Sequence, residues 1–322
     1  MSLTIGQVQA AATKAINERV VDSIWLENLF LEKVKAKEKQ WAGERMSFMV
    51  NYFDDDDTTG SFYSGSVALA NTEYDPYTEH VHELIEQQET MKIAHRDIAR
   101  ASGKQAKINL LERRLKDFKK AMAQRMNRAI MSDGTATDGV DSKTLNGFQI
   151  AGLPAFLISS GTYGGLSSSD VAGHAAYISS NSGVNRALTT TLHQLVLGGA
   201  TEGNIKPGLG ICRQNVFNEI TELLKAYQVT MKESSISGLG HSGELVYNGV
   251  SHIIDNLAPA NTLSLLNMDY VNLYSHPDYN MVQSDWDKLE NSDCLQHRLR
   301  WKGNFICDTL RFQGQIKDIT VV

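Results

Sequence analysis

Hydrophobic residues recur at steps of three and four through residues 103–132, which is the spacing of one face of an α-helix. The apolar positions of this stripe are Ile108, Leu111, Leu115, Phe118, Met122, Met126 and Ile130. Gly134 follows the last of them, and glycine commonly ends a helix because it adopts the left-handed conformation without strain. At about 1.5 Å of rise per residue, the pattern predicts a helix roughly 45 Å long, longer than most globular helices.

Two shorter apolar stripes in residues 4–38 predict a helical N-terminal arm in two pieces. The first stripe contains Ile5, Val8, Ala12, Ala15 and Ile16, and the second contains Ile24, Leu26, Leu29, Phe30, Leu31 and Val34. The arm ends in lysines between Lys33 and Lys39, and positive charge suits the C-terminus of a helix and its dipole. We expect this arm to pack on the body of the protein.

Residues 43–90 predict a long β-hairpin. Hydrophobic side chains alternate along 46–53, and extended polar character returns over about 78–92. Between them lies the run Asp54–Ser61, which predicts an acidic turn. The hairpin has little hydrophobic face of its own, and an isolated two-stranded hairpin is marginally stable in water. We therefore expect it to rest on another body, which in an assembly is a neighbouring subunit.

The remaining chain begins with a segment rich in Gly, Ser and Thr at 132–185, which predicts loops and a domain connection. The predicted helices beyond it are Leu188–Leu197 and Gln214–Tyr227, and the predicted strands are Leu209–Cys212, Glu244–Ile254 and Thr262–Asn267. A final hairpin is predicted over Leu295–Phe312, with its turn at Lys302-Gly303-Asn304. No series of parallel βαβ units and no dinucleotide-binding fingerprint occurs, so the predicted fold class is α+β.

The composition is that of a globular protein. The chain has 322 residues, of which 42% are hydrophobic and 21% charged, which excludes wholesale disorder and is enough for two lobes. No apolar run approaches the roughly 20 residues of a membrane helix, and the N-terminus lacks the basic-then-apolar pattern of a secretory signal. Cys212, Cys294 and Cys307 make no disulfide framework, so we expect reduced thiols in a cytosolic compartment.

Charge is distributed unevenly along the chain, although its formal sum is only −6. Residues 41–90 contain one basic and eleven acidic residues, a net charge of −10, whereas residues 91–132 contain twelve basic and three acidic residues, a net charge of +9. Three interpretations are open. The two segments fold against each other within one chain, or each forms a solvated face, or they meet between subunits, where complementary charge sets register and steers association. The negative total argues against a surface that coats nucleic acid, and the basic helix lacks interleaved aromatic residues.

The sequence contains no recognisable catalytic or metal-binding motif. Asp54–Asp57 are consecutive aspartates without the alternating ligands and closing Glu of a calcium hand, so a solvated acidic turn is the better interpretation. His80 and His82 share one face of a predicted strand with no third ligand indicated, and Cys212 has no paired base. We expect these histidines to be structural or exposed, Cys212 to be a small core residue, and the chain to have no catalytic residue, no metal and no cofactor.

Several short motifs accompany this order of parts. They are the arm segment Trp25–Lys35, Ser132-Asp133-Gly134-Thr135 at the end of the long helix, Gly147-Phe148-Gln149, Gly161-Thr162-Tyr163-Gly164-Gly165, Lys206-Pro207-Gly208 and Arg311-Phe312-Gln313-Gly314. In these motifs and in their order, nearly the whole chain resembles the major capsid protein family of tailed bacteriophages, which shares its fold with encapsulins. The run Ser167-Ser168-Ser169-Asp170 departs from the family pattern after Leu166, where an acidic-basic pair and aromatic residues are usual.

The resemblance implies a domain plan for the chain. It comprises an N-terminal arm at 1–40, an extended loop at 41–90, a peripheral domain at 91–185 containing the spine helix 103–132, an axial domain at 186–267, and peripheral-domain strands at 268–322. The implied protein is structural and not an enzyme. It assembles as pentamers and hexamers into an icosahedral shell around double-stranded DNA, which it contacts without sequence specificity.

The implied partners are other copies of the chain, a scaffolding protein and a portal protein, with no membrane. The implied location is the virion capsid, and the host cytoplasm during assembly. Some family members join subunits covalently through a lysine of the extended loop, but no lysine lies between Lys39 and Lys92 here, so we expect no such cross-link. About 40 residues precede the loop, too few for the internal scaffold of other members, which favours a separate scaffolding protein.

In such a shell, a contact between subunits accounts for the opposite charges of residues 41–90 and 91–132. We expect the acidic loop of one subunit to meet the basic helix of the next. The residues of this predicted interface are Asp54, Asp55, Asp56 and Asp57 on the loop, and Arg113, Arg114, Lys119 and Lys120 on the helix. Two alternatives remain at this point, an encapsulin-like compartment that loads protein cargo and a soluble metal-binding enzyme.

Overall fold

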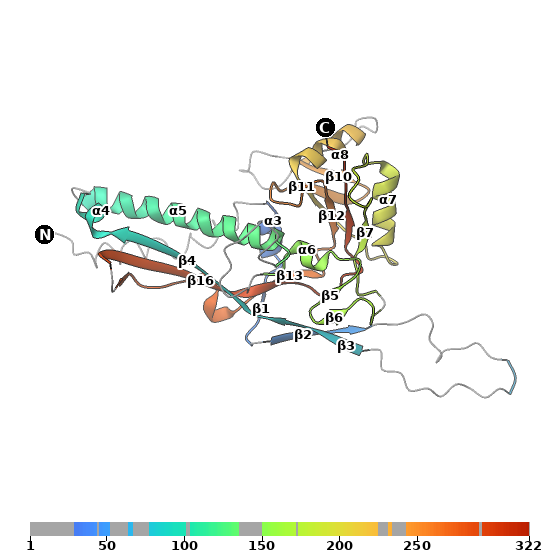
Figure 1. Ribbon diagram of the computed structural model, residues 1–322, viewed down its shortest axis with the longest axis horizontal. Helices are drawn as coiled ribbons and strands as arrows, with labels where there is room; N and C mark the ends of the chain where they lie inside the picture. The colour runs from blue at the N-terminus through green and yellow to red at the C-terminus, as the bar shows by residue number, and fades with distance from the viewer. Residues whose placement is uncertain are drawn as a thin grey trace.

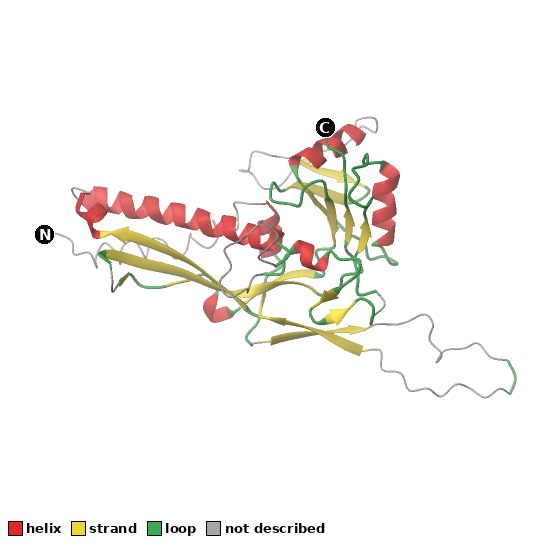
Figure 2. Ribbon diagram, in the orientation of Figure 1, coloured by secondary structure: helices red, strands yellow, loops and turns green. Residues whose placement is uncertain are grey.

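The computed structural model describes residues 29–43, 45–51, 64–66, 77–100, 104–134, 150–171, 173–224, 231–233, 243–289 and 292–321. The acidic run Asp54–Asp57 and the first predicted helix of the arm lie outside these residues. Figure 1 shows an elongated part, in which a long helix runs along a pair of strands, and beside it a lobe with a second sheet and its own helices. Figure 2 shows a separate pair of strands extending along the underside of the body.

The long helix is α5, Lys104–Met131, which confirms the prediction over 103–132. It follows the short helix α4 (His95–Arg100) and packs on strand β4 (Ile85–Ala94), whose Met91 and Ile93 are buried. The stripe positions Leu115, Phe118, Met122, Met126 and Ile130 are all buried, as their spacing predicts. Burial of one such side chain contributes about 1.5–3 kcal/mol, so this face holds the helix on the sheet.

Strand β16, Cys294–Cys307, is continuous, so the predicted turn at Lys302-Gly303-Asn304 is wrong. It pairs antiparallel with β4 from Cys294 to Gly303, and Gly303–Cys307 pairs with β13 (Val271–Ser275). A Cβ atom on Gly303 would lie 2.2 Å from the carbonyl oxygen of Tyr274. The glycine therefore marks a close approach of two backbones inside a sheet, which in sequence looks the same as a turn.

The predicted long hairpin is present at its base as β2 (Arg45–Asn51) and β3 (Tyr77–Glu83), which pair antiparallel from Arg45–Glu83 to Asn51–Tyr77. The polar stretch at 78–92 is not one strand, because it breaks at Leu84. Residues before the break belong to the hairpin, and residues after it form β4 of the body. The side-chain amide of Asn304 donates to the carbonyl of Glu83 at 2.9 Å and fixes this junction to β16.

The lobe contains the sheet β7-β17-β12-β8-β11-β10-β9. Its strands are β7 (Tyr177–Ser179), β8 (Leu209–Cys212), β9 (Met231–Glu233), β10 (Gly243–Tyr247), β11 (Val250–Ile254), β12 (Leu263–Leu266) and β17 (Gly314–Ile316). Helices α7 (Thr190–Gly199) and α8 (Gln214–Leu224) cover it with Val196, Leu197, Val216 and Ile220 in the core. Strands β8 and β11 pair in parallel, while the β10–β11 and β8–β12 pairs are antiparallel.

The strand predicted over Glu244–Ile254 is two strands, β10 and β11, joined by a tight turn. Asn248 and Gly249 have φ of 55° and 84°, the left-handed values that a two-residue hairpin turn of the primed type requires. Asn-Gly is the strongest local signal for that turn, and here it lies between alternating hydrophobic residues.

The second piece of the predicted arm is part of the body. Helix α3 (Leu29–Lys35) buries Phe30, Leu31 and Val34 completely, and Phe30 meets Phe305 of β16 edge to face. The remaining short elements are β1 (Lys39–Gln40), α6 (Leu153–Phe156), β5 (Thr162–Tyr163), β6 (Leu166–Ser167), η2 (Pro277–Tyr279), β14 (Val282–Gln283) and β15 (Asp287–Lys288). In the part of the chain that the structure describes, no helix combines the length and apolarity needed to span a bilayer.

Candidate functional site

The hairpin β2–β3 has an inward and an outward face. On the inward face Met46 is buried, and Phe48 stacks on His80 with ring centroids 5.2 Å apart. Met46 packs with Tyr274 and Ile306, so the hairpin is seated on the end of the β13–β16 pair. On the outward face Met49 is 79% exposed, Tyr77 58% and Val81 36%. These three apolar side chains therefore project away from the body, on a face where Glu79 lies between Tyr77 and Val81.

Histidine side chains and their hydrogen bonds form the remaining contacts between the hairpin and the body. We call this contact region as a whole the hairpin seat. His80 Nε2 lies 3.2 Å from the carbonyl oxygen of Asp308, and because a carbonyl only accepts, this nitrogen carries the proton. His80 Nδ1 is then an acceptor in the neutral ring, and His82 Nε2 donates to it at 2.9 Å. His174, in the turn after β6, donates from Nε2 to the carbonyl of Tyr163 at 3.3 Å. The rings of His80 and Tyr163 contact each other and the rings of both His82 and His174, with centroids 4.8–6.2 Å apart.

Burial keeps these rings neutral. It lowers the pKa of His80 and of His82 to about 4, against an ordinary value of 6.5, and it lowers the pKa of His174 as well. The nitrogens of His80 that a metal would need already serve hydrogen bonds, one as donor and one as acceptor. Across the described ranges, no group of three or more His, Cys, Asp or Glu side chains is arranged to hold a metal ion. His80 and His82 are thus buried, and these hydrogen bonds leave neither nitrogen of His80 unoccupied.

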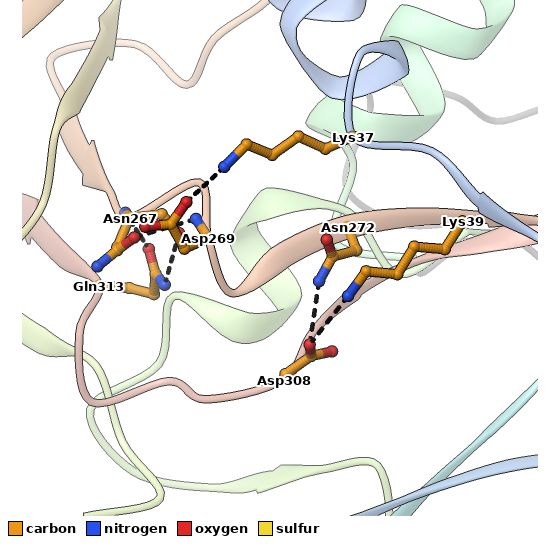
Figure 3. Close-up of polar contacts among 7 residues, drawn as sticks. All are labelled: Lys37, Lys39, Asn267, Asp269, Asn272, Asp308 and Gln313. Carbon is orange, nitrogen blue, oxygen red and sulfur yellow. Dashed lines mark hydrogen bonds and ion pairs between the residues drawn. The ribbon is translucent and has the colours of Figure 1, made fainter.

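A second set of polar contacts attaches the end of the arm (Figure 3). Lys37 Nζ is 2.5 Å from Asp269 Oδ1, and Lys39 Nζ is 4.0 Å from Asp308 Oδ2. The amide of Asn272 donates to the same Asp308 oxygen at 3.0 Å. Burial raises the pKa of the Asp308 carboxyl despite these partners. Asp308 therefore joins two parts, since its carboxylate binds the arm and its carbonyl binds the hairpin.

The structure brings part of the predicted charged interface into view. Arg113 and Lys120 lie exposed on α5, and Arg114 is 4.0 Å from Asp97 of α4. The side chain of Lys119 and the aspartates Asp54–Asp57 lie outside the described residues. Among the described residues, the acidic and basic segments meet within one chain through Glu89 and Arg125, whose atoms are 2.9 Å apart.

Sequence reasoning missed His174 and Gly164 as members of the hairpin seat. The amide of Val81 donates to the carbonyl of Gly164 at 2.8 Å, and a Cβ on Gly164 would lie 2.9 Å from His82 Nε2. Gly164 has φ of 60°, so it supplies both the turn and the space for the rings. The GTYGG motif was the available signal, because it places Tyr163 and Gly164 together, but nothing local connects it with residue 80.

The three cysteines are free thiols. Cys212 and Cys307 are buried, and burial raises the pKa of the Cys212 thiol to about 12 and that of Cys307 further still. Cys294 and Cys307 lie at opposite ends of β16, too far apart in a single strand to pair.

Comparison with known proteins identifies the fold. The sequence matches no protein-family model and no curated protein. Among solved structures, the chain is similar to the capsid asymmetric unit of cyanophage A-1(L), with 18% identity, a TM-score of 0.68, and coverage of 91% of this chain and 93% of that one. It is similar to the capsid of a native GTA particle at 13% identity, a TM-score of 0.60 and 90% coverage of both chains.

A third similar structure is the holo-SrpI encapsulin complex from Synechococcus elongatus, at 12% identity, a TM-score of 0.55, and coverage of 100% of this chain and 98% of that one. Near-complete coverage in both directions means that these proteins share one arrangement of elements along the whole chain. The predicted α+β fold of tailed-phage major capsid proteins, which encapsulins share, is confirmed.

Proposed function

We propose that this chain is the major capsid subunit of a tailed bacteriophage or a related particle. It assembles into pentamers and hexamers that close an icosahedral shell around double-stranded DNA. The observation that carries the proposal is the β2–β3 hairpin, which turns exposed Met49, Tyr77 and Val81 away from its own body. The fold shared with a cyanophage capsid chain supports the same conclusion.

The first test is the size of the assembly. Light scattering and negative-stain imaging of the purified chain at two protein concentrations should show rings of five or six subunits, tubes or closed shells. A chain that stays a 35.6 kDa monomer at high concentration both alone and when co-expressed with its scaffolding protein contradicts the proposal.

The encapsulin alternative rests on its own observation, the full-length match to an encapsulin chain. The two functions differ in what the shell contains. Particles purified after nuclease treatment should protect double-stranded DNA if the chain is a viral capsid protein, whereas co-purification of a single enzyme without nucleic acid supports a cargo compartment.

The proposed partners are other copies of the chain, a separate scaffolding protein, a portal protein and the packaged DNA, and the proposed location is the virion. The net charge of −6 is compatible with DNA retention by closure of the shell, without a basic lining.

We expect the substitution Met49→Ser to weaken assembly without weakening the subunit. Met49 is 79% exposed, so its loss should change the free energy of unfolding by no more than about 0.5 kcal/mol. If a neighbour covers this side chain, each contact loses about 1.5 kcal/mol or more, and the concentration needed for assembly rises about tenfold. Light scattering against concentration measures this, with Ser47→Ala, on the same face of the same strand, as the control. Equal assembly of both variants and the natural chain would show that the outward face is not an interface.

A second interface prediction concerns the opposite charges of the loop and α5. Replacing Asp54–Asp57 with lysine should prevent shell closure, and adding Arg113→Glu and Arg114→Glu should partly restore it, because two of the four basic positions on the helix then attract the new lysines. One exposed pair contributes at most about 1 kcal/mol, but the contact repeats around a shell and reversal turns attraction into repulsion. Imaging of particles at low and high salt measures the effect. Normal assembly after the first change alone contradicts this interface.

A further inference from the structure

The seat of the hairpin is made largely of imidazole rings. His80 and His82 project inward from β3 and are 0% and 9% exposed, and His174 comes from the turn after β6 and is 2% exposed. The amide of Val81, between the two hairpin histidines, is bonded to Gly164, whose backbone lies against the ring of His82 and the Cβ of His80. The contacts of the hairpin with the body therefore pass through groups that can change charge.

We propose that His80, His82 and His174 form an acid-sensitive latch, which holds the β2–β3 hairpin on the body while the rings are neutral and releases it when they are protonated. The latch is a property of the single chain and does not depend on the proposed shell.

The hydrogen bond between the two hairpin histidines requires an unprotonated Nδ1 on His80. His80 Nδ1 accepts from His82 Nε2, so a proton added to His80 Nδ1 removes the acceptor and sets two N–H groups against each other at 2.9 Å. Two imidazolium rings with centroids 5.0 Å apart would also repel. Protonation of His80 thus breaks the bond that joins the two hairpin histidines, and protonation of either ring adds charge inside the packed seat.

The groups around the rings offer little compensation. Tyr163 of β5 contacts both hairpin rings, His174 contacts the ring of His80 from the loop after β6, and Asp308 contacts His80 from the residue after β16. Cys307 and Tyr274 lie one step further out, against Tyr163 and Phe48. Asp308 touches His80 through its backbone carbonyl, while its carboxylate serves Asn272, Tyr274 and Lys39 of β1. Arg45, Glu79 and Glu83 lie on the outward face of the hairpin, away from the rings.

The direction of the pH effect follows from the burial of the rings. In the closed state burial lowers the pKa of His80 and of His82 to about 4, whereas in an opened hairpin the rings return toward 6.5. The open state binds more protons, so acid favours it. Between about pH 6.5 and pH 4, opening should increase by up to tenfold per pH unit for each histidine released.

The hairpin can open without unfolding the body because the two are separate strand pairs. β2 and β3 pair with each other, whereas β4, beyond the break at Leu84, pairs with β16. The apolar part of the seat is small, with Met46, Tyr274 and Ile306 buried and Trp41 and Phe48 partly buried against them.

Hydrogen exchange of the full chain tests the latch. Amides of 46–50 and 78–82 are followed from pH 7.5 to pH 4.5, corrected for intrinsic exchange, and compared with amides of β13, which lies outside the lobe that contains His193 and His252. We expect the hairpin amides to lose protection with acid and to exchange faster than those of β13 at each acidic pH, because the hairpin opens before the body unfolds. Hairpin protection that does not fall between pH 7.5 and pH 4.5, or that equals the protection of β13 throughout, overturns the proposal.

Variants separate the latch from general acid sensitivity. The double variant His82→Gln, His174→Gln keeps an N–H donor near each Nε2 but removes two titrating groups. The factor by which hairpin opening increases per pH unit should therefore be smaller than in the natural chain, by up to a hundredfold. His193→Gln is the matched control, because His193 is an equally buried histidine in the other lobe. It should leave hairpin exchange unchanged. An unaltered pH dependence in the double variant, or an equal change in the control, overturns the assignment to these residues.

Discussion

Gly303→Ala is expected to destabilise the protein by about 3 kcal/mol or more, a large effect for one methyl group. The new Cβ atom would lie 2.2 Å from the carbonyl oxygen of Tyr274 and 2.4 Å from Cζ2 of Trp301, well inside van der Waals contact. The carbonyl belongs to the backbone of β13, and Trp301 is 0% exposed, so neither neighbour can move without disturbing the sheet or the core. Urea unfolding followed by tryptophan fluorescence measures the loss, since Trp301 itself lies at the site.

Gly198→Ala is the matched control for this substitution. Gly198 lies in helix α7, and no atom approaches within 4 Å of the position its Cβ would take. Alanine is favoured over glycine in a helix, so we expect no loss and a gain of up to about 0.5–1 kcal/mol. A Gly303→Ala protein as stable as the Gly198→Ala protein would show that β13 and β16 do not approach as closely as described.

Gly303 also shows where sequence reasoning reached its limit in this fold. The apolar stripe of 103–132 predicts α5 nearly to the residue, because a helix is determined by contacts three and four positions apart. Strand β16 depends on partners distant in the chain, β13 and, two hundred or more residues away, β4. No local pattern distinguishes a glycine in a crowded sheet from one in a turn. The turn at Asn248-Gly249, in contrast, could have been predicted from the sequence, because Asn-Gly is a local signal for a hairpin.

Part of the candidate site could be predicted from local sequence, and part of it depends on contacts between distant segments. The period of two along β3 predicts that His80 and His82 share a face, and the structure places both on the buried one. His174 and Gly164 join them only through the packing of β5–β6 under the hairpin, which the sequence does not encode locally. The pairing of Asp54–Asp57 with α5 stays a prediction, because it concerns the contact between two chains.

The second large effect is a loss of stability in acid that arises in the lobe, at His193 and His252. The Nδ1 atom of His252 donates to the carbonyl of Leu245 at 3.1 Å, so its Nε2 accepts from His193 Nε2 at 3.2 Å, and both rings are neutral. Burial lowers the pKa of each to about 4. A Cβ on Gly210 would lie 2.6 Å from the ring of His252, so the ring packs directly over this glycine.

The sign of the effect follows from proton uptake. In the unfolded chain both histidines titrate near 6.5, so below that pH the unfolded state binds more protons than the folded one. The free energy of unfolding therefore has its full value above about pH 6.5. Between pH 6.5 and pH 4 it falls by about 1.4 kcal/mol per pH unit for each of the two histidines. Because of this pair, the free energy of unfolding should be about 4 kcal/mol lower at pH 5 than at pH 7.5.

His193→Gln tests this assignment, because the glutamine amide retains a donor toward His252 and removes one titrating group. The free energy of unfolding, from urea titrations followed by circular dichroism, should change little at pH 7.5, and the loss between pH 7.5 and pH 5 should be smaller than in the natural chain by about 2 kcal/mol. An identical acid loss in the variant would mean that this pair already carries a proton in the folded protein. Since a positive charge there would face a second imidazole with no carboxylate among the contacts described for it, that result would require a different packing of β11 against α7.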